Sequence, residues 1–439
     1  MIYILLIILF FYLMLNYFLC QKDILAAPVI VTVTFLFGTF CALANNKLWG
    51  IGLSVDTVII ISLGIISFTL GYIAVKQKRI NTSSIFANSI DIENWKSIIL
   101  IFYGAITIVL YYSEVKRMAS AYGYTGGFSM MMSAFSAVTK YKTTLGANID
   151  GMSGIVNVLY KGLTAIAYMY LYLFVRLVSL PKKVPKKKSK VIIYVLPIAE
   201  FVFCTICSAS RLAILKLFVA GALLYFIFKN ADNGWRKVDL SSYKNIIIGI
   251  LVVAFLFSYT RGLVGRNNSL DPFSYITAYA GGPIELLDLY IKDPNGATDL
   301  IGQETFSAIY SLLYKITNNP IFNYSVHKEF RNAVTGVTVG NVYTAFRAYY
   351  NDFGLLGVLI IPGFIGNFYA LLYKRVRQRT SRYPINFNVL LYVYFSAGFV
   401  FMFIDDLFCS TILGANSIIM IIMFYMLNVF LFKLRIKIK

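Results

Sequence analysis

The sequence has 439 residues, of which 59% are hydrophobic and only 13% are charged, and its formal net charge is +21. A mean hydropathy of +0.73 excludes an ordinary soluble globular protein. The composition is typical of an all-α polytopic membrane protein, whose helices need about 20 apolar residues each to cross a bilayer.

Apolar runs of spanning length recur along the chain. The first has no small-residue cleavage site after its apolar core, so we expect it to be a retained span rather than a signal peptide. No internal repeat is visible, and we expect a single integral-membrane domain over residues 1–439. In chain order, the sequence predicts about eleven membrane helices, at 2–19, 24–44, 57–75, 97–113, 154–178, 191–207, 212–228, 245–260, 354–373, 386–403 and 412–432.

Basic residues are concentrated in short connections between these runs. With eleven spans all of these connections fall on one face, which the positive-inside rule assigns to the cytoplasm. The sequence therefore predicts an N-terminus outside and a C-terminus inside. This placement also explains the high positive charge, because basic segments on the cytoplasmic face contact anionic lipid. Binding of nucleic acid is not needed to explain the charge. The basic segments are Lys22, KQKR at 76–79, KKVPKKKSK at 182–190, the 229–244 loop, KRVRQRTSR at 374–382 and the C-terminal KLRIKIK.

Two long connections fall on the outer face, at 114–153 and 261–341. The larger one contains PIELLDLYI and ETFSAIYSLLYKI, whose apolar residues recur at helical spacing. We expect these pieces to be helices that lie in the membrane interface or cap the bundle. The polar face available for function is therefore the outer one.

Several classes of chemistry are disfavoured. The cytoplasmic loops are short and have no glycine-rich phosphate-binding motif, which argues against nucleotide-driven chemistry. Cys204 and Cys207 form a CxxC, but inside an apolar run they are expected to be structural, like the other three cysteines. With His327 as the single histidine, no zinc-binding spacing exists. We expect no cofactor and no metal held by protein ligands, so a substrate that reacts outside must carry its own energy, as a lipid-linked diphosphate does.

Four arginines lie at the predicted outer ends of membrane helices. A guanidinium presents planar paired donors that match phosphate oxygens and keeps its charge, which suits binding of a diphosphate at headgroup level. The alternative is that each side chain only reaches toward lipid headgroups. These residues are Arg211 in CSASR, Arg261 and Arg266 in YTRGLVGR, and Arg347.

Charges also occur inside the predicted spans. Glu200 and Lys216 lie at similar depth on successive antiparallel helices, and Lys161 enters its span at a comparable level. Charges buried in a bilayer usually face the bundle interior. We expect either a structural Glu200–Lys216 pair or a floor beneath a substrate cavity, with Lys161 among the substrate-binding candidates. Arg176 is expected only to reach the cytoplasmic headgroups.

Two segments carry a family resemblance. CSASR at 207–211 is similar to the Ser-Arg turn of the O-antigen polymerase and ligase superfamily, and GNVYTAFRAYYNDFGLLG at 340–357 resembles the segment that leads from its large external loop into the next helix. The layout also resembles the Wzy-type oligosaccharide repeat unit polymerases. The resemblance implies a GT-C-like membrane glycosyltransferase of the bacterial plasma membrane, acting on undecaprenyl-diphosphate-linked repeat units at its outer face. It also implies that Arg211 and Arg347 bind the sugar diphosphate, while Arg261 and Arg266 join them by placement alone.

The resemblance leaves alternatives open. Ligases of the superfamily have a histidine before the Asn-x-Tyr, where this chain has Gly340, which favours a polymerase. A lipid-linked oligosaccharide flippase or transporter would more naturally show an internal repeat and charges at the midplane. Expected partners of a polymerase are the lipid-linked oligosaccharide, membrane lipids, a chain-length regulator and a flippase.

The sequence does not identify the general base. The candidates are His327 and the acidic residues of the outer region. Glu285 is ranked first because it follows a Gly-Gly-Pro bend in a stretch that can re-enter the bundle mouth, and His327 is second because an imidazole titrates near neutral pH. Asp352 is a third candidate that can instead pair with Arg347. Asp288 and Glu304 complete the set, and Tyr343, Tyr349 and Tyr350 are expected to anchor at the interface or to stack on sugars.

Overall fold

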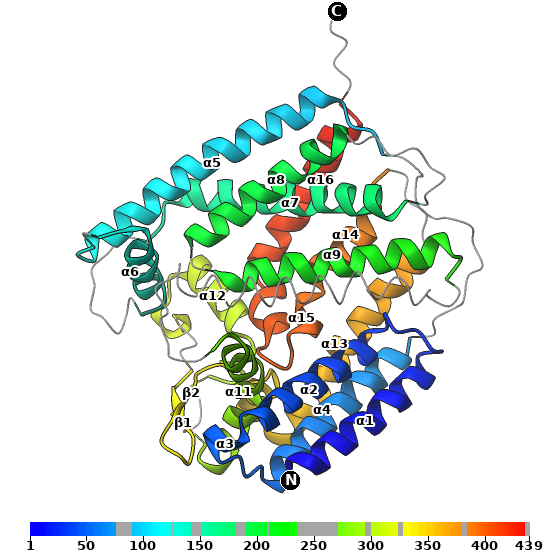
Figure 1. The fold of residues 1–439 in the computed structure, drawn as a ribbon, viewed down its shortest axis with the longest axis vertical. Coiled ribbons are helices and arrows are strands. Elements are labelled where there is room, and N and C mark those ends of the chain that lie inside the picture. The colour runs from blue at the N-terminus through cyan, green and yellow to red at the C-terminus, as the bar shows by residue number, and fades with distance from the viewer. Residues whose placement is uncertain are drawn as a thin grey trace, which may run out of the picture. The chain divides into compact units, whose positions relative to one another are not determined.

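The computed structural model describes residues 1–75, 90–124, 126–141, 151–180, 189–208, 210–235, 271–294, 300–323, 328–378 and 384–434, which are almost entirely helical (Figure 1). Within these ranges nine helices are long and apolar enough to cross a membrane. They confirm a multi-pass membrane protein and match nine of the predicted runs. They are α1 (Ile2–Leu19), α2 (Ala27–Ala44), α4 (Val55–Ile73), α5 (Asn94–Ala121), α7 (Gly154–Ser179), α8 (Ser189–Cys207), α9 (Arg211–Asp232), α13 (Phe346–Gln378) and α16 (Ala415–Phe432).

The structure does not show the remaining two predicted spans as single long helices. The run at 245–260 lies outside the described residues. The run at 386–403 forms two shorter helices, α14 (Phe387–Phe395) and α15 (Ala397–Val400), followed by the π-helix η2 (Phe408–Ile412). The total of eleven spans therefore stays a prediction.

The chain divides into two compact units, each built from separate stretches of sequence. The first unit comprises Met1–Arg79, Phe273–Gln378 and Phe395–Ile418. The second comprises Ile80–Pro272, Arg379–Tyr394 and Ile419–Lys439.

In the first unit α1, α2, α4 and α13 lie side by side (Figure 1), and the closest pair is α4 with α13. Small residues make this approach possible: a Cβ built on Gly71 would lie 1.8 Å from the carbonyl oxygen of Gly363, and one on Gly366 would lie 2.1 Å from that of Phe68. Membrane helices associate through such contacts because the lipid supplies no hydrophobic drive between them.

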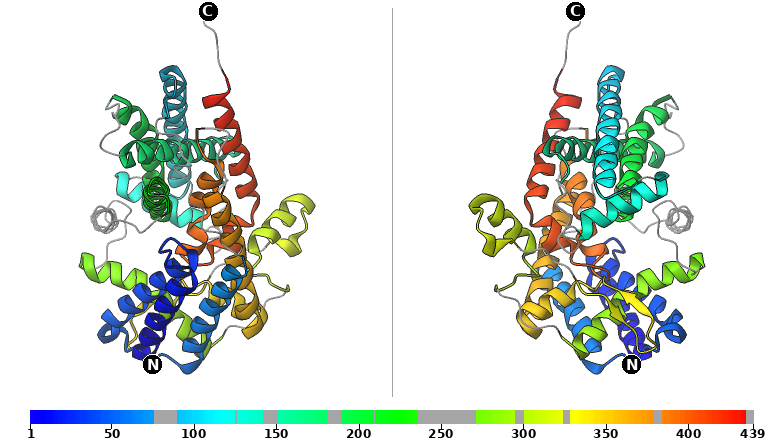
Figure 2. Two further views of the ribbon diagram at one scale, coloured as in Figure 1. Left: turned by 90° about the vertical axis from the view of Figure 1, so that its right-hand side faces the viewer. Right: turned by 90° about the vertical axis from the view of Figure 1, so that its left-hand side faces the viewer.

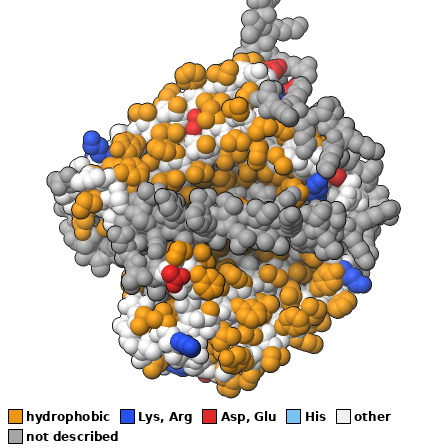
Figure 3. Space-filling view, viewed as in Figure 1, with side chains coloured by type: hydrophobic (Ala, Val, Ile, Leu, Met, Phe, Trp, Pro, Cys, Tyr) orange, Lys and Arg blue, Asp and Glu red, His pale blue; other side chains and the backbone are white. Residues whose placement is uncertain are grey.

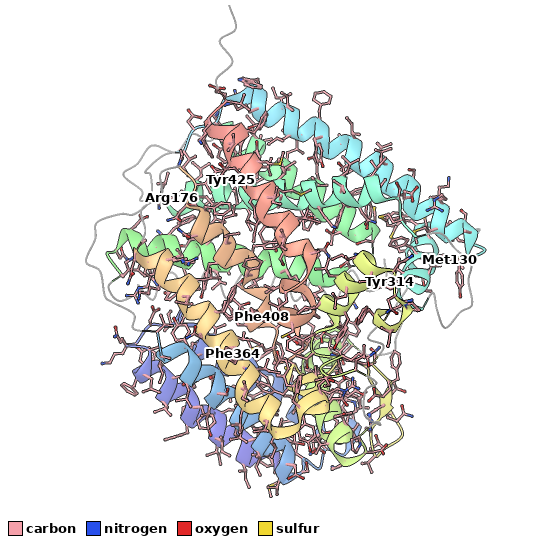
Figure 4. All side chains as sticks on the ribbon, turned by 180° about the vertical axis from the view of Figure 1, so that it is seen from behind. Met130, Arg176, Tyr314, Phe364, Phe408 and Tyr425 are labelled. Carbon is pink, nitrogen blue, oxygen red and sulfur yellow. The ribbon has the colours of Figure 1, made fainter. Side chains whose placement is uncertain are left out.

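Large apolar side chains cover the outside of this helix group. On α1, Tyr3, Ile7 and Phe11 are all exposed, and hydrophobic side chains cover the face of α1 seen in Figure 3. Phe364 of α13 is likewise 73% exposed and points outward (Figure 4). Apolar exposure of this extent is expected of side chains that face lipid.

The segment of the first unit that the sequence predicts to be external is helical at both predicted places. Helix α11 (Pro272–Lys292) packs into the unit, where a Cβ on Gly281 would overlap the backbone of α2 at Ala42, and α12 (Ser307–Thr317) projects from the unit (Figure 2) with Ile316 exposed. The sequence did not predict the short antiparallel pair β1 (Arg331–Asn332) and β2 (Thr338–Gly340). The segment also contains η1 (Pro320–Phe322), and α3 (Asn46–Trp49) follows α2.

The second unit packs α5, α7, α8 and α9 together, with α6 (Phe128–Tyr141) against the end of α5. Figure 4 shows Met130 of α6 and Arg176 of α7 near opposite ends of this unit. Arg176 differs from expectation, because it is buried and its Nη1 lies 2.7 Å from Asp232 Oδ2 on α9 instead of reaching the headgroups. A buried guanidinium needs such a partner.

Candidate functional site

Helix α13 contains a break at the Asp-Phe-Gly of the sequence. Gly354 has φ 59° and ψ −149° inside the helix, a conformation that is open to glycine and strained for other residues. The break separates a short outer helix, residues 346–353, from the apolar part of α13. Arg347 and Asp352 both lie on this outer helix. The break at Gly354 therefore lets the helix that carries them run in a different direction from the apolar part of α13.

Arg347 is buried at the centre of a polar cluster. Its Nη2 lies 2.9 Å from Glu329 Oε2 and its Nη1 lies 3.5 Å from Glu304 Oε1. The guanidinium carbon is 4.6 Å from the ring centroid of Tyr290 and 4.3 Å from that of Tyr343, so both tyrosines contribute cation–π contacts. We call these five residues the Arg347 cluster.

A docked turn brings Glu304 to the cluster. Asp352 Oδ2 accepts the Thr305 N–H at 2.6 Å, and the Thr305 hydroxyl donates to the Ala348 carbonyl at 3.2 Å. These bonds fix the 300–306 turn on the outer helix, with Glu304 facing Arg347. Asp352 therefore has a positioning role, and the carboxylates that pair with Arg347 are Glu304 and Glu329.

Glu329 is held from two sides. The Tyr343 hydroxyl donates to Glu329 Oε1 at 2.9 Å, and Arg331 Nε donates to the same oxygen at 2.9 Å. Tyr343 is fully buried, so its ring covers Arg347 instead of anchoring at the membrane surface. Glu329 was not among the candidate residues, although its position in HKEFR, next to two basic residues, was a signal of an ion-pair network.

The two carboxylates of the cluster differ in their ionisation. Burial raises the pKa of Glu304 above its usual value, against the opposing charge of Arg347. Burial also acts to raise the pKa of Glu329, but hydrogen bonds from its own backbone and Arg331, with the charge of Arg347, leave that pKa lowered. Among the described residues, Arg347 Nε, Arg347 Nη1 and Glu304 Oε1 have no hydrogen-bond partner. The hydrogen bonding of the buried guanidinium is thus incomplete at Nε and weak at Nη1, which has only the 3.5 Å ion pair with Glu304.

Helix α11 carries the two acidic candidates Glu285 and Asp288. Asp288 Oδ1 accepts bonds from the Ser54 amide at 2.6 Å, the Ser54 hydroxyl at 2.8 Å and the Thr57 hydroxyl at 2.6 Å, and so holds the start of α4. Glu285 is buried, and its Oε2 has no hydrogen-bond partner in the described part of the chain. Burial, and then the nearby Asp288, raise its pKa to about 7, against the charge of Lys292. Glu285 is therefore able to exchange a proton near neutral pH.

The Ser-Arg turn lies in the second unit, where Arg211 begins α9 and is largely buried. The preceding Ser210 makes no side-chain cap hydrogen bond to this helix start. Ser208 and Ser210 of the turn also line a cavity of about 440 Å³. Lys161 follows one of the other lining residues, Tyr160, on α7 and is half-buried.

Glu200 lies deeper in the second unit, against α5. A Cβ on Gly104 would lie 2.0 Å from Glu200 Oε2, and this oxygen has no hydrogen-bond partner among the described residues. The absence of a side chain at Gly104 therefore leaves room for the Glu200 carboxylate. All five cysteines are free and buried, including Cys204 and Cys207 on the same helix.

The predicted site residues therefore fall into three groups. Arg347, Tyr343, Asp352 and Glu285 belong to the first unit, where Arg347 and Tyr343 are in direct contact and Asp352 acts through the 300–306 turn. Arg211 and Lys161 belong to the second unit. Arg261, Arg266 and His327 lie outside the described residues.

Comparison with known proteins adds no relative: no family model, no curated protein and no solved structure matches this chain.

Proposed function

We propose that the chain is a Wzy-type polymerase that joins undecaprenyl-diphosphate-linked oligosaccharide repeat units on the outer leaflet of the bacterial plasma membrane. The acceptor hydroxyl oxygen forms a bond to the anomeric carbon as the bond from that carbon to the diphosphate breaks. The electron pair leaves with the lipid diphosphate, and the hydroxyl proton passes to a base. The product is a lipid-linked chain that is longer by one repeat unit. Such chains become O-antigen, capsule or exopolysaccharide.

The observation that carries this proposal is the incomplete hydrogen bonding of Arg347. A buried guanidinium with incomplete hydrogen bonding is costly unless a ligand completes it. Among the described residues Nε has no hydrogen-bond partner, and Nη1 has only the ion pair with Glu304 at 3.5 Å, so each of these two donors can bind a phosphate oxygen. As the diphosphate departs, negative charge grows on its oxygens. A preorganised guanidinium stabilises that charge more in a water-poor site than in water. Arg211, in the second unit, is proposed separately as a phosphate-binding residue.

Glu285 is the proposed base. Its raised pKa, about 7, leaves a substantial fraction of the carboxyl ionised at neutral pH, which is the condition for efficient proton acceptance. Glu285 also precedes Tyr290 by five residues on α11, and Tyr290 contacts Arg347. A helical rise of about 1.5 Å per residue puts the two positions about 7.5 Å apart along the helix axis. Five residues also turn the side-chain direction by about 140°, so Glu285 shares a helix with the Arg347 cluster but faces another side of it.

Gly340 supports a polymerase over a ligase of the same superfamily. The ligases have a histidine at the corresponding position, whereas Gly340 has φ +140°. A histidine at that φ would be strained. The backbone here is therefore suited to glycine, and a proton acceptor must come from another element.

Incubation of the purified protein with a lipid-diphosphate repeat unit, without nucleotide or added metal, tests the proposal. We expect a ladder of products. Arg347→Lys keeps the charge but loses the paired donors, and we expect a loss of rate of about 100-fold. Lys315→Gln, which removes a positive charge from the exposed face of α12, is the matched control and should keep the ladder. A reconstituted wild-type protein that forms no ladder would overturn the proposal.

A further inference from the structure

The cavity of the second unit lies where four elements end. Its lining comes from the end of α5, from α6, from the start of α7, and from the turn between α8 and α9. The volume of about 440 Å³ lies within the range of about 300–1,000 Å³ that is typical of small-molecule sites. All four of these helix ends are on the face that the distribution of basic residues predicts to be extracytoplasmic.

The described part of the lining is rich in hydroxyl groups. No charged side chain is among its eleven described residues. An ionised ligand group buried there would lack a partner, which is costly. Thr139, Asn157, Tyr160 and Ser208 also bond within the protein, but a hydroxyl both donates and accepts, and an alkyl chain would leave this remaining capacity unused. Six of the eleven have hydrogen-bonding side chains: Tyr111, Thr139, Asn157, Tyr160, Ser208 and Ser210.

An aromatic stack makes one wall rigid. The rings of Tyr111 and Tyr160 lie 4.9 Å apart with an interplanar angle of 27°, and Tyr160 stacks in turn on Phe201 at 5.9 Å and 25°. These rings come from α5, α7 and α8, so the packing of three helices fixes them. Tyrosine combines an apolar ring face with a hydroxyl that donates and accepts, which matches the two kinds of surface of a sugar ring.

We propose that this cavity binds uncharged sugar residues of the lipid-linked substrate. The sugar hydroxyls exchange hydrogen bonds with the serine, threonine, asparagine and tyrosine side chains, and a sugar ring packs on the tyrosine wall. The charged part of the substrate stays outside the cavity. The identity of the lipid carrier rests on the proposed function, whereas recognition of a neutral glycan rests on the cavity itself.

Two glycines provide a matched test. Gly151 lines the cavity, and a Cβ on it would meet no atom within 4 Å. Gly151→Trp therefore adds an indole at the lining of the cavity, at a position whose Cβ meets no described atom. Gly127, also in the second unit, has the same open surroundings but does not line the cavity. Gly127→Trp is the control for adding an indole.

The probe is the neutral repeat-unit oligosaccharide, released by mild acid from the source cell's own surface polysaccharide and carrying no lipid or phosphate. Binding to full-length protein in nanodiscs is followed by saturation-transfer NMR. We expect wild type and Gly127→Trp to bind alike, and Gly151→Trp to bind at least about tenfold more weakly, a difference of about 1.4 kcal/mol. Tyr160→Phe, which removes one hydroxyl and keeps the wall, is expected to weaken binding severalfold.

Equal binding by wild type and Gly151→Trp, or no binding by wild type, would overturn the cavity assignment. Binding of inorganic diphosphate that Gly151→Trp abolishes would overturn it as well, because the cavity would then hold the charged group. The assay needs no polymerisation, so its failure is distinguishable from failure of the proposed function. A protein that binds the glycan in this way but yields no product ladder overturns the polymerase proposal alone.

Discussion

At the scale of single residues, the Arg347 cluster combines a fixed cation with two unequal carboxylates. Glu329 receives three hydrogen-bond donors and is ionised, so it neutralises Arg347 in the absence of substrate. Glu304 lies farther from the guanidinium, at 3.5 Å, and burial raises its pKa above the usual value, against the charge of Arg347. Its pairing with Arg347 is therefore weaker than that of Glu329. An incoming phosphate would displace Glu304 more readily than Glu329, while Glu329 keeps the arginine in place.

The ionisation of Glu285 gives the first prediction. Its folded-state pKa is raised from 4.5 to about 7, so the folded protein keeps this proton to higher pH than the unfolded chain does. The stability linked to this group is fully present below pH 4.5 and is lost as pH rises to about 7. Glu285→Gln stays neutral throughout. We expect its thermal midpoint in detergent to exceed that of wild type at pH 8 and to differ less at pH 5.

The same variant is expected to lose glycosyl transfer while gaining stability, a combination that a purely structural glutamate would not give. A midpoint below that of wild type at pH 8 would mean that the carboxylate is ionised and paired in the folded protein. In that case Glu285 would be removed from the list of bases.

Asp352 gives the second prediction, because it acts through the 300–306 turn. Its charge-assisted bond to the Thr305 amide belongs to a class worth about 1.5–3 kcal/mol. We expect Asp352→Ala to lower the unfolding free energy by about that amount and to speed amide exchange in the turn, measured by hydrogen–deuterium exchange and mass spectrometry. Asp293→Ala, at a carboxylate that is 91% exposed, is the control. Unchanged exchange at the turn would show that other contacts hold it.

At the scale of elements, hydropathy predicted most of what the structure shows for the spans and little of what it shows for the site. The predicted helix at 354–373 begins eight residues earlier, at Phe346, and breaks at Gly354. Polar residues such as Arg347 and Asp352 end an apolar run, although they continue the helix. Local hydropathy cannot distinguish a helix that ends at such residues from one that continues through them. Here the helix continues because the outer helix is stabilised by tertiary contacts with the 300–306 turn.

The site residues show the same division. The placement of arginines at span ends identified Arg347, and the helical spacing of PIELLDLYI identified the helix that carries Glu285. Glu329 and Tyr290 were missed, because their proximity to Arg347 depends on how β1 and α11 pack. That packing joins segments separated by tens of residues, and no short-range pattern encodes it.

The contact between α4 and α13 gives the third prediction. Gly71→Ala would put a methyl group where the Gly363 carbonyl oxygen lies, 1.8 Å from the ideal Cβ, so the helices must move apart. We expect a loss of at least about 1–3 kcal/mol, the usual range for overpacking. Gly221→Ala on α9 is the matched control, because its Cβ would meet only Leu171 methyl groups at ordinary contact distance, 3.4 Å and beyond. Thermal unfolding of both variants measures the difference, and equal midpoints would contradict the proposed close packing.

At the scale of the whole molecule, each unit gathers distant parts of the chain. The first unit combines α1, α2 and α4 with α13, more than 270 residues later. Membrane helices pair through shape and small residues rather than through sequence neighbourhood. The sequence therefore predicts the order of the spans along the chain but not which of them pack together. The division into two units was not predicted.

Sidedness gives the last prediction, and labelling of single cysteines tests it. The positive-inside rule assigns α12 to the outer face and the end of α13 to the cytoplasm. All five native cysteines are buried, so background labelling should be low. Lys315 and Arg375 are exposed in the first unit, and we expect a membrane-impermeant maleimide to label Lys315→Cys in intact cells and Arg375→Cys only after permeabilisation. An outer α12 also requires the predicted span at 245–260, because an odd number of spans precedes that segment. The reverse labelling pattern would place the Arg347 cluster on the cytoplasmic side, where an outer-leaflet diphosphate could not reach it.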